Sequence, residues 1–324
     1  MALIDIQHLT KNFVVSRNWL GQAKQILTAV HDVSLSVDPG ETVGIVGESG
    51  CGKSTFARTA MGLYEKTNGT VLYQGKDTAR SDVYAAYRRN VQMIFQDPYA
   101  SLDPRMTVED IISEPLWNYH VYDSDSDRRH AVAKLLETVD LRPEAAQRYP
   151  HEFSGGQRQR VGIARALALH PECIFCDEPI SALDVSVQVQ IINMLDRLQD
   201  ELGLAYVFIA HDLAMVHHVS QRIGVMYLGR LVELGPSDDV FREPLHPYTQ
   251  MLIASVPRPD PKAERVTIAK GEVPSPLQAP SGCVFHPRCP YADETCRHLE
   301  PVLVEVHPGR FVACHHVKGG RSHA

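Results

Sequence analysis

The feature that most constrains this chain is a glycine-rich run at residues 47–55, Gly-Glu-Ser-Gly-Cys-Gly-Lys-Ser-Thr. It follows the apolar run 42–46, which predicts a buried strand, and it leads into a predicted helix that ends near Gly62. Glycines at this spacing let successive backbone N–H groups point into one concavity, and the helix adds the positive end of its dipole. The pattern predicts a phosphate-binding loop rather than a simple turn.

This loop is predicted to bind ATP together with Mg²⁺. Lys53 is expected to reach the β and γ phosphates, and the Ser54 hydroxyl is expected to bind Mg²⁺. Cys51 lies at a variable position of the motif and is interpreted as a small filler. The predicted nucleotide-binding residues of the loop are Gly47, Glu48, Ser49, Gly50, Cys51, Gly52, Lys53, Ser54 and Thr55.

Two acidic residues follow the apolar run at residues 173–176. A strand that ends in this way would place Asp177 in the Mg²⁺ coordination shell and Glu178 against the attacking water. Phosphoryl transfer depends on an aligned water and on charge neutralisation, so Glu178 is predicted to be the catalytic base or water-orienting group. Cys173 and Cys176 have C-x-x-C spacing, but their place on a strand favours buried core thiols.

Length, charge and hydropathy exclude several other classes of protein. The 324 residues suffice for one large domain and a smaller one. A formal net charge of −7 without a basic block disfavours nucleic acid as a partner. No apolar run approaches the roughly 18 residues of a membrane span, and the first residues lack the features of a signal peptide. We therefore expect a cytoplasmic protein.

Four further motifs follow in the order found in ATP-binding subunits of ABC transporters, and the chain resembles that family over nearly its whole length. The motifs are Gln96 within Ile-Phe-Gln-Asp-Pro, residues 153–157 (Phe-Ser-Gly-Gly-Gln), residues 181–184 (Ser-Ala-Leu-Asp) and His211. The resemblance implies catalytic roles for Gln96, Glu178 and His211. Gln96 would contact Mg²⁺ and water, and His211 would hold the γ phosphate and the attacking water.

The resemblance also implies a site shared between two ATPase subunits. Ser154, Gly155, Gly156 and Gln157 open a predicted helix whose N-terminal amides favour an anion. In the family, two subunits pack head to tail, and this loop caps the γ phosphate that the opposite subunit holds. Phe153 stands where leucine is commonest, which leaves the polar loop intact.

Two more residues receive roles from the resemblance. Asp184 would organise the dimer interface, and Phe13 matches the position of the aromatic residue that stacks on adenine.

The predicted fold is an α/β P-loop NTPase with a RecA-like mixed sheet core, an antiparallel β subdomain and a helical subdomain at about 97–160. The ATP-binding domain is expected at 1–256. Prolines after Val256 mark a small, loop-rich C-terminal metal-binding domain at 257–324. Residues 123–127 are predicted to form an exposed acidic loop before an amphipathic helix at 128–139.

Several segments resemble the oligopeptide/dipeptide importer branch of the family. They are residues 106–115, 149–153, 183–188, 245–249 and 281–292. This implies an ATPase that powers peptide uptake from the cytoplasmic face of the cell membrane. The implied partners are a second, paralogous ATPase subunit, two transmembrane permease subunits and an extracytoplasmic solute-binding protein.

Two alternative functions stay open at this point. The first is an importer subunit for nickel, glutathione or similar solutes. The second is a soluble ABC ATPase acting on DNA or ribosomes. Against it stand the single set of motifs, the short separation of the two glycine loops and the acidic charge.

Four cysteines near the C-terminus suggest a metal site. They are Cys283, Cys289, Cys296 and Cys314, separated by five, six and seventeen residues. The spacing lacks the close pairs typical of structural zinc, whereas four thiolates on loops can hold a [4Fe–4S] cluster, as the importer resemblance implies. Zinc or unliganded thiols are the alternatives. Nearby histidines that could compete as ligands are His286, His315 and His316.

Overall fold

The computed structural model describes residues 1–17, 23–256 and 272–317, which belong to two compact units. The first unit consists of Met1–Val37, Thr42–Ala79 and Phe208–Ala324, and the second of Asp38–Glu41 and Arg80–Val207. The predicted proline-rich boundary after Val256 lies largely outside the described residues. The domain limits 1–256 and 257–324 therefore stay predictions.

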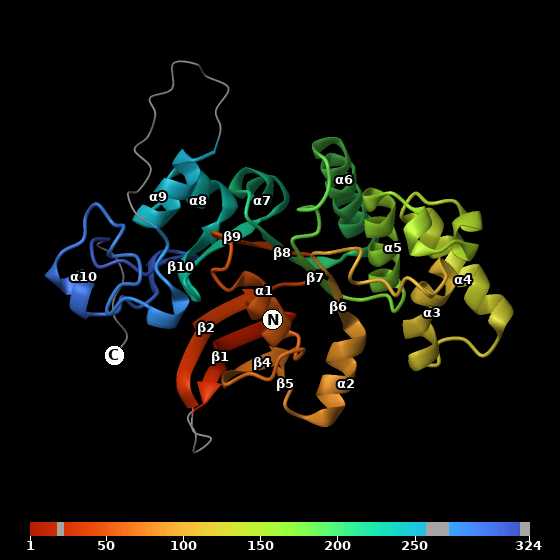
Figure 1. Cartoon of the computed structure of the whole chain (residues 1–324), viewed down its shortest axis with the longest axis horizontal. Helices are drawn as coiled ribbons and strands as arrows, with labels where there is room; N and C mark the ends of the chain where they lie inside the picture. Colours follow the sequence, from red (N-terminus) through yellow and green to blue (C-terminus); the bar gives the residue numbers. More distant parts are fainter. Residues whose placement is uncertain (18–22, 257–271, 318–324) are drawn as a thin grey trace. The chain divides into compact units, whose positions relative to one another are not determined.

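An antiparallel sheet in the first unit has the strand order β2-β1-β4-β5 (Figure 1). Its strands are β1 (Ile4–Arg17), β2 (Ala23–Val37), β4 (Asn68–Tyr73) and β5 (Lys76–Asp77). Ile4 of β1 lies opposite Val37 of β2 and Tyr73 of β4, and all three side chains are buried. Buried apolar and more exposed polar residues alternate from Ile4 to Gln7, so at this end of β1 the face of the sheet that carries Ile4 and Ile6 is packed.

A mixed sheet in the same unit carries the glycine-rich loop. Its strands follow the order β11-β12-β10-β9-β3. They are β3 (Thr42–Val46), β9 (Arg222–Tyr227), β10 (Arg230–Pro236), β11 (Val304–His307) and β12 (Arg310–Val312). β3 pairs in parallel with β9, whereas β9 pairs antiparallel with β10. Every residue of β3 is buried, which explains its unbroken apolar sequence.

Short helices complete the described part of the first unit. They are α1 (Lys53–Ala60), α7 (Leu213–Val219), α8 (Ser237–Arg242), α9 (Pro247–Ala254), the 3₁₀ turn η3 (Pro276–Gln278) and α10 (Glu294–His298). α1 ends two residues before Gly62, close to the predicted end.

The second unit contributes parallel strands to the fold. β6 (Val91–Ile94) pairs in parallel with β7 (Cys173–Asp177), and β8 (Ala205–Ala210) contains the division between the units. Cys173 and Cys176 are fully buried on β7, as predicted for core thiols. Burial raises the pKa of both thiols and keeps them protonated.

Helices form the rest of the second unit. They are α2 (Ser81–Asn90), α3 (Val108–Asn118), α4 (Asp125–Thr138), η1 (Pro143–Gln147), η2 (Pro150–Glu152), α5 (Gly155–Leu167) and α6 (Val185–Leu202). Contacts join α3, α4 and α5 into one helical layer (Figure 1). In the described ranges, no helix is long and apolar enough to cross a membrane.

The predicted acidic loop at 123–127 is wrong in its extent, because α4 begins at Asp125. The Ser124 hydroxyl accepts a hydrogen bond from the Asp127 N–H at 3.1 Å. Carboxylates in a first helical turn also interact favourably with the helix dipole. Capping and charge together therefore turn most of this acidic run into helix.

A buried arginine joins α4 to α3. Arg128 donates hydrogen bonds to Ser113 Oγ at 2.8 Å and to Asp125 Oδ1 at 3.0 Å, and its guanidinium lies 4.5 Å from the centre of the Trp117 ring. Its side chain is 7% exposed, whereas that of the neighbouring Arg129 is 67% exposed. We expect Arg128, and not Arg129, to stabilise this helical layer.

Arg128→Met should lower the free energy of unfolding by about 2 kcal/mol, because it leaves the buried Ser113 hydroxyl without its donor. Arg129→Met is the matched control and should cost less than about 1 kcal/mol, since the Arg129 side chain is exposed and its partner Glu109 keeps a hydrogen bond from Gln147 and the ion pair with Arg128. Urea unfolding followed by Trp117 fluorescence measures both. Equal losses for the two variants would contradict the assignment.

Candidate functional site

The loop between β3 and α1, predicted to form the phosphate-binding concavity, packs closely against neighbouring strands at two glycines. Gly47 and Gly52 have φ angles of 155° and 107°, and a β carbon at either position would lie 2.2 Å from a backbone oxygen, of Met226 and of Ala29 respectively. Side chains are therefore excluded at both positions. The backbone comes close to β9 and β2, as a phosphate-binding loop at a helix N-terminus requires.

Lys53 is buried and folds back over this loop. Its Nζ donates to the carbonyl oxygen of Gly47 at 2.7 Å and to that of Glu48 at 3.1 Å. The ammonium group is thus held at the mouth of the backbone concavity, where a polyphosphate would meet it. Cys51 is buried beside it, and burial raises the pKa of this thiol, which fits a filler rather than a nucleophile.

Glu48 is held by two residues from much later in the chain. Its backbone N–H donates to the Tyr248 hydroxyl at 2.8 Å, and its carboxylate accepts two hydrogen bonds from Arg288 at 2.8 and 3.0 Å. The hydrogen bonds to Glu48 raise the pKa of Arg288 further above its already high value. No local sequence pattern assigns Arg288 to this loop.

Phe13 lies on β1 and is half-buried. Its ring meets Tyr64 edge to face at 5.6 Å between centroids, and Lys11 Nζ lies 4.8 Å from its centroid. Its role in binding adenine stays a prediction.

In the second unit the structure brings Gln96 and Glu178 together. Ile94 of β6 lies opposite Cys176 of β7, so the two strands end at the same edge of the sheet. Gln96 Nε2 donates to Glu178 Oε2 at 2.8 Å just beyond that edge, and Asp177 is fully buried at the end of β7. Ligands of parallel α/β sheets bind outside such carboxyl ends.

Glu178 has an uncommon backbone conformation for a residue other than glycine. Its φ is 46°, in the left-handed region, which costs on the order of 1–3 kcal/mol. Its carbonyl oxygen accepts hydrogen bonds from the backbone N–H and the hydroxyl of Ser181 at 3.3 and 3.1 Å. The turn therefore fixes the direction of the Glu178 side chain, as a residue that orients a water requires.

The second glycine loop is an exposed helix start. Ser154 Oγ accepts the Gln157 N–H at 3.3 Å, and Gln157 Oε1 accepts the Ser154 N–H at 3.0 Å, which forms a capping box at the start of α5. Gly155 is exposed, whereas a β carbon at Gly156 would lie 2.4 Å from Val187 Cγ1. The helix start thus exposes Ser154, Gly155 and Gln157 and packs Gly156 against α6.

The two remaining predicted residues are both exposed at helix starts. Asp184 precedes α6. His211 follows β8 and precedes Asp212. The Asp212 carboxylate caps α7 by accepting hydrogen bonds from the N–H groups of Ala214 and Met215.

Comparison with known proteins decides the family. Residues 30–181 match the ABC transporter family, and residues 232–296 match the C-terminal region of oligopeptide/dipeptide transporters. The chain is 52% identical to the oligopeptide transport ATP-binding protein OppF of Salmonella typhimurium, over 93% of this chain and 92% of OppF. It is 49% identical to AppF of Bacillus subtilis, over 97% of each. The chain belongs to the ATP-binding proteins of ABC transporters.

A solved structure supports the fold and chemistry of this ABC ATPase. The ATP-binding cassette MJ0796, in a dimer described as a post-hydrolysis state bound to ADP and Pi, is 30% identical with a TM-score of 0.64. The match covers 72% of the present chain and 98% of that cassette. The predicted P-loop NTPase fold with a mixed sheet is confirmed, and ATP hydrolysis is the family's reaction.

The C-terminal cysteines of this ABC ATPase lie near one another. Burial first, and then repulsion from the other three thiols, raises the pKa of Cys283 to about 11. Burial likewise raises the pKa of Cys289 and of Cys296, with repulsion from Cys314 among the further causes. The Cys283 N–H donates to the Cys296 carbonyl oxygen at 2.8 Å, and Cys296 Sγ lies 3.6 Å from His316 Nε2, two residues after Cys314, so three of the four cysteine segments lie side by side.

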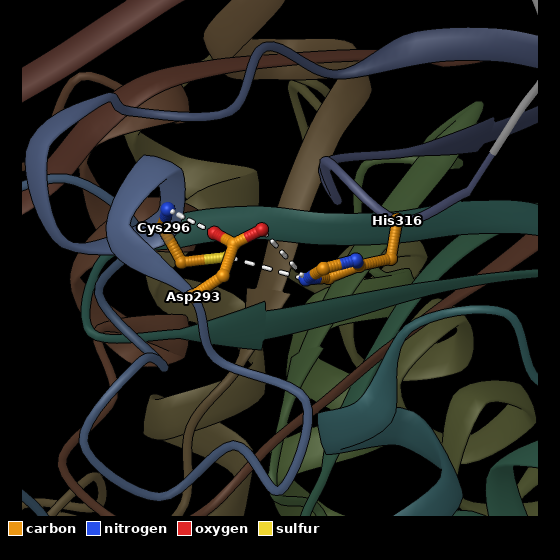
Figure 2. Close-up of side chains that lie close together, drawn as sticks. All are labelled: Asp293, Cys296 and His316. Carbon is orange, nitrogen blue, oxygen red and sulfur yellow. Dashed lines mark hydrogen bonds and ion pairs between the residues drawn. The ribbon is translucent and has the colours of Figure 1, made fainter.

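The tightest set of ligand atoms in the described ranges is not a set of four thiols. It consists of Asp293, Cys296 and His316, whose ligand atoms lie within 4.8 Å of one another (Figure 2). His316 Nε2 is 3.6 Å from Cys296 Sγ and 3.7 Å from the Asp293 carboxylate. A tetrahedral zinc site would bring four ligand atoms to about 3.8 Å from one another, given Zn–S bonds of about 2.3 Å. Asp293, Cys296 and His316 approach that spacing, whereas the described residues include no such set made of the four cysteine thiols.

Lys53→Ala should weaken MgATP binding by about 100-fold, because the concavity loses the cation that charge-assists phosphate binding. Lys76→Ala, on an exposed position of β5, should leave the dissociation constant unchanged. Titration calorimetry with MgATP measures both. Wild-type affinity in Lys53→Ala would remove the loop from the nucleotide site.

Proposed function

We propose that this protein is the ATP-hydrolysing subunit of an importer for di- and oligopeptides and that it acts on the cytoplasmic face of the cell membrane. The observation that carries the proposal is the glycine-rich cradle with its buried Lys53, in a chain whose residues 232–296 match the oligopeptide/dipeptide transporter region. The relatives OppF and AppF carry the name of oligopeptide transport ATP-binding proteins and match over nearly the whole chain.

Hydrolysis is proposed to depend on three side chains of this chain. Glu178 would orient the attacking water or accept its proton, and Gln96, already within hydrogen-bond distance of Glu178, would fix that carboxylate. His211 would contact the γ phosphate. The proposed Mg²⁺ ligands are Ser54, Gln96 and Asp177, and the ion would neutralise phosphate charge.

The active site is proposed to need a second ATPase subunit. The start of α5 exposes Ser154, Gly155 and Gln157, with the positive end of a thirteen-residue helix behind them. Close by, Val185 and Val189 on α6 are 75% and 54% exposed. A polar anion-binding loop beside exposed apolar side chains fits a surface that closes over another subunit's nucleotide. A paralogous subunit, two permease subunits and a solute-binding protein would complete the assembly.

Glu178→Gln should reduce ATP turnover by about 100-fold or more while MgATP still binds, because the amide cannot take up a proton. The stalled protein should then accumulate as an ATP-dependent dimer. Glu201→Gln, at an exposed position of α6, is the control. Phosphate release and sedimentation velocity are the measurements. Wild-type turnover in Glu178→Gln would exclude the role of Glu178.

The C-terminal thiols are proposed to hold a [4Fe–4S] cluster with Cys283, Cys289, Cys296 and Cys314 as ligands. Loop segments carry Cys283, Cys289 and Cys314, the short helix α10 carries Cys296, and a cluster of several metal ions separates its ligands more than one ion does. His316, near Cys296, is the alternative ligand if a single metal ion binds.

Anaerobically purified protein should contain about four iron and about four sulfide per chain, as a four-cysteine cluster requires. Cys289→Ser should lower both, whereas Cys51→Ser, far from this segment in sequence, should not. Iron, sulfide and zinc analysis measures the metal content of each variant, and visible absorption detects the cluster. One zinc per chain, or no metal at all, would contradict the cluster.

A further inference from the structure

We propose that Arg288 is a positioning residue of the phosphate loop, and that its ion pair with Glu48 makes the C-terminal segment set the affinity for MgATP. The inference rests on the proposed ATP-binding function and deepens it. The ATP-site motifs of the sequence do not include Arg288, which lies between Cys283 and Cys289 in the C-terminal segment.

The ion pair has a specific geometry. Arg288 Nη1 lies 2.8 Å from Glu48 Oε2, and Nη2 lies 3.0 Å from Glu48 Oε1. The guanidinium group therefore binds both carboxylate oxygens at once. This bidentate contact fixes the orientation of the Glu48 carboxylate as well as its distance from Arg288. The arginine side chain is buried, and that of Glu48 is 26% exposed. Such a pair is worth more than an exposed surface ion pair.

The Arg288–Glu48 ion pair is connected to Lys53 through the backbone of Glu48. The Glu48 N–H is bonded to the Tyr248 hydroxyl, and the Glu48 carbonyl oxygen accepts from Lys53 Nζ at 3.1 Å. All three polar parts of Glu48 are thus engaged. Any rotation of this residue would move a carbonyl group that holds the phosphate-binding lysine.

Charge gives the ion pair a second effect. A carboxylate in a phosphate-binding loop repels a polyphosphate, and the repulsion is strong where water is partly excluded. The fork of Arg288 neutralises Glu48 and turns its oxygen atoms toward the C-terminal segment. The loop can then present backbone N–H groups and Lys53 to the nucleotide without an opposing charge.

Arg288 is itself held in a tight turn. Its N–H donates to the Phe285 carbonyl oxygen at 3.0 Å, and the buried Phe285 ring packs against Tyr227 and Tyr248 with centroids 5.3 and 5.4 Å away. Tyr227 ends β9 and also accepts a hydrogen bond from Arg288 at 3.4 Å. An aromatic cluster therefore fixes the turn that carries the arginine.

A double-mutant cycle between Arg288 and Glu48 tests the proposal. Arg288→Gln should raise the Kd for MgATP about tenfold, whereas kcat at saturating ATP should change less than about twofold, since the residue does not touch the reacting atoms. Adding Glu48→Gln should return Kd to within about threefold of wild type, because the unpaired carboxylate is gone. Arg288→Lys should fall in between, since an ammonium group keeps the charge but not the fork.

Two controls separate this role from a purely structural one. Arg242→Gln removes an arginine with an exposed ion pair on α8 and should leave Kd unchanged. Thermal unfolding without nucleotide reports on stability alone. A lower melting temperature with wild-type Kd in Arg288→Gln, or a double variant as weak as Arg288→Gln, would overturn the proposal. Wild-type binding by Lys53→Ala would instead refute the nucleotide site itself.

Discussion

The structure of this protein depends on one steric constraint, the close approach of the loop 47–52 to two neighbouring strands. A β carbon at Gly47 or Gly52 would overlap a carbonyl oxygen of β9 or β2. The loop can therefore lie against these strands only with glycine at both positions. This approach places the loop where residues after β9 can support it, as Tyr248 and Arg288 do through Glu48.

A second constraint acts on the proposed catalytic groups, because the backbone and hydrogen bonds of Glu178 fix the orientation of its carboxylate. Glu178 follows a fully buried strand in an unfavourable left-handed conformation, with its carbonyl oxygen bound by Ser181 and its side chain by Gln96. The start of α5 leaves Ser154, Gly155 and Gln157 exposed. A strained acid and an exposed helix start are together what the proposed reaction between two subunits would need.

Much of this could be predicted from the sequence, because local patterns carry it. The apolar run of β3, the glycines after it and the helix ending near Gly62 specify one another within residues 42–62, and Ser154 and Gln157 specify their own helix cap. The sequence does not predict the start of α4 correctly. The acidic run 123–127 is typical of a loop, but capping by the Ser124 hydroxyl stabilises the helix from Asp125 onward. The pairing of Arg288 with Glu48 joins residues 240 positions apart, and no local pattern signals such a contact.

ATP hydrolysis by this chain should power the import of peptides. The most direct test is to measure peptide uptake in a reconstituted transport system. The chain would be assembled in proteoliposomes with its permease subunits, its partner ATPase and the solute-binding protein loaded with a labelled oligopeptide. Uptake of the labelled oligopeptide should require ATP, and the ATPase rate should rise when the loaded binding protein is added. ATPase activity indifferent to the membrane subunits, without peptide uptake, would contradict it.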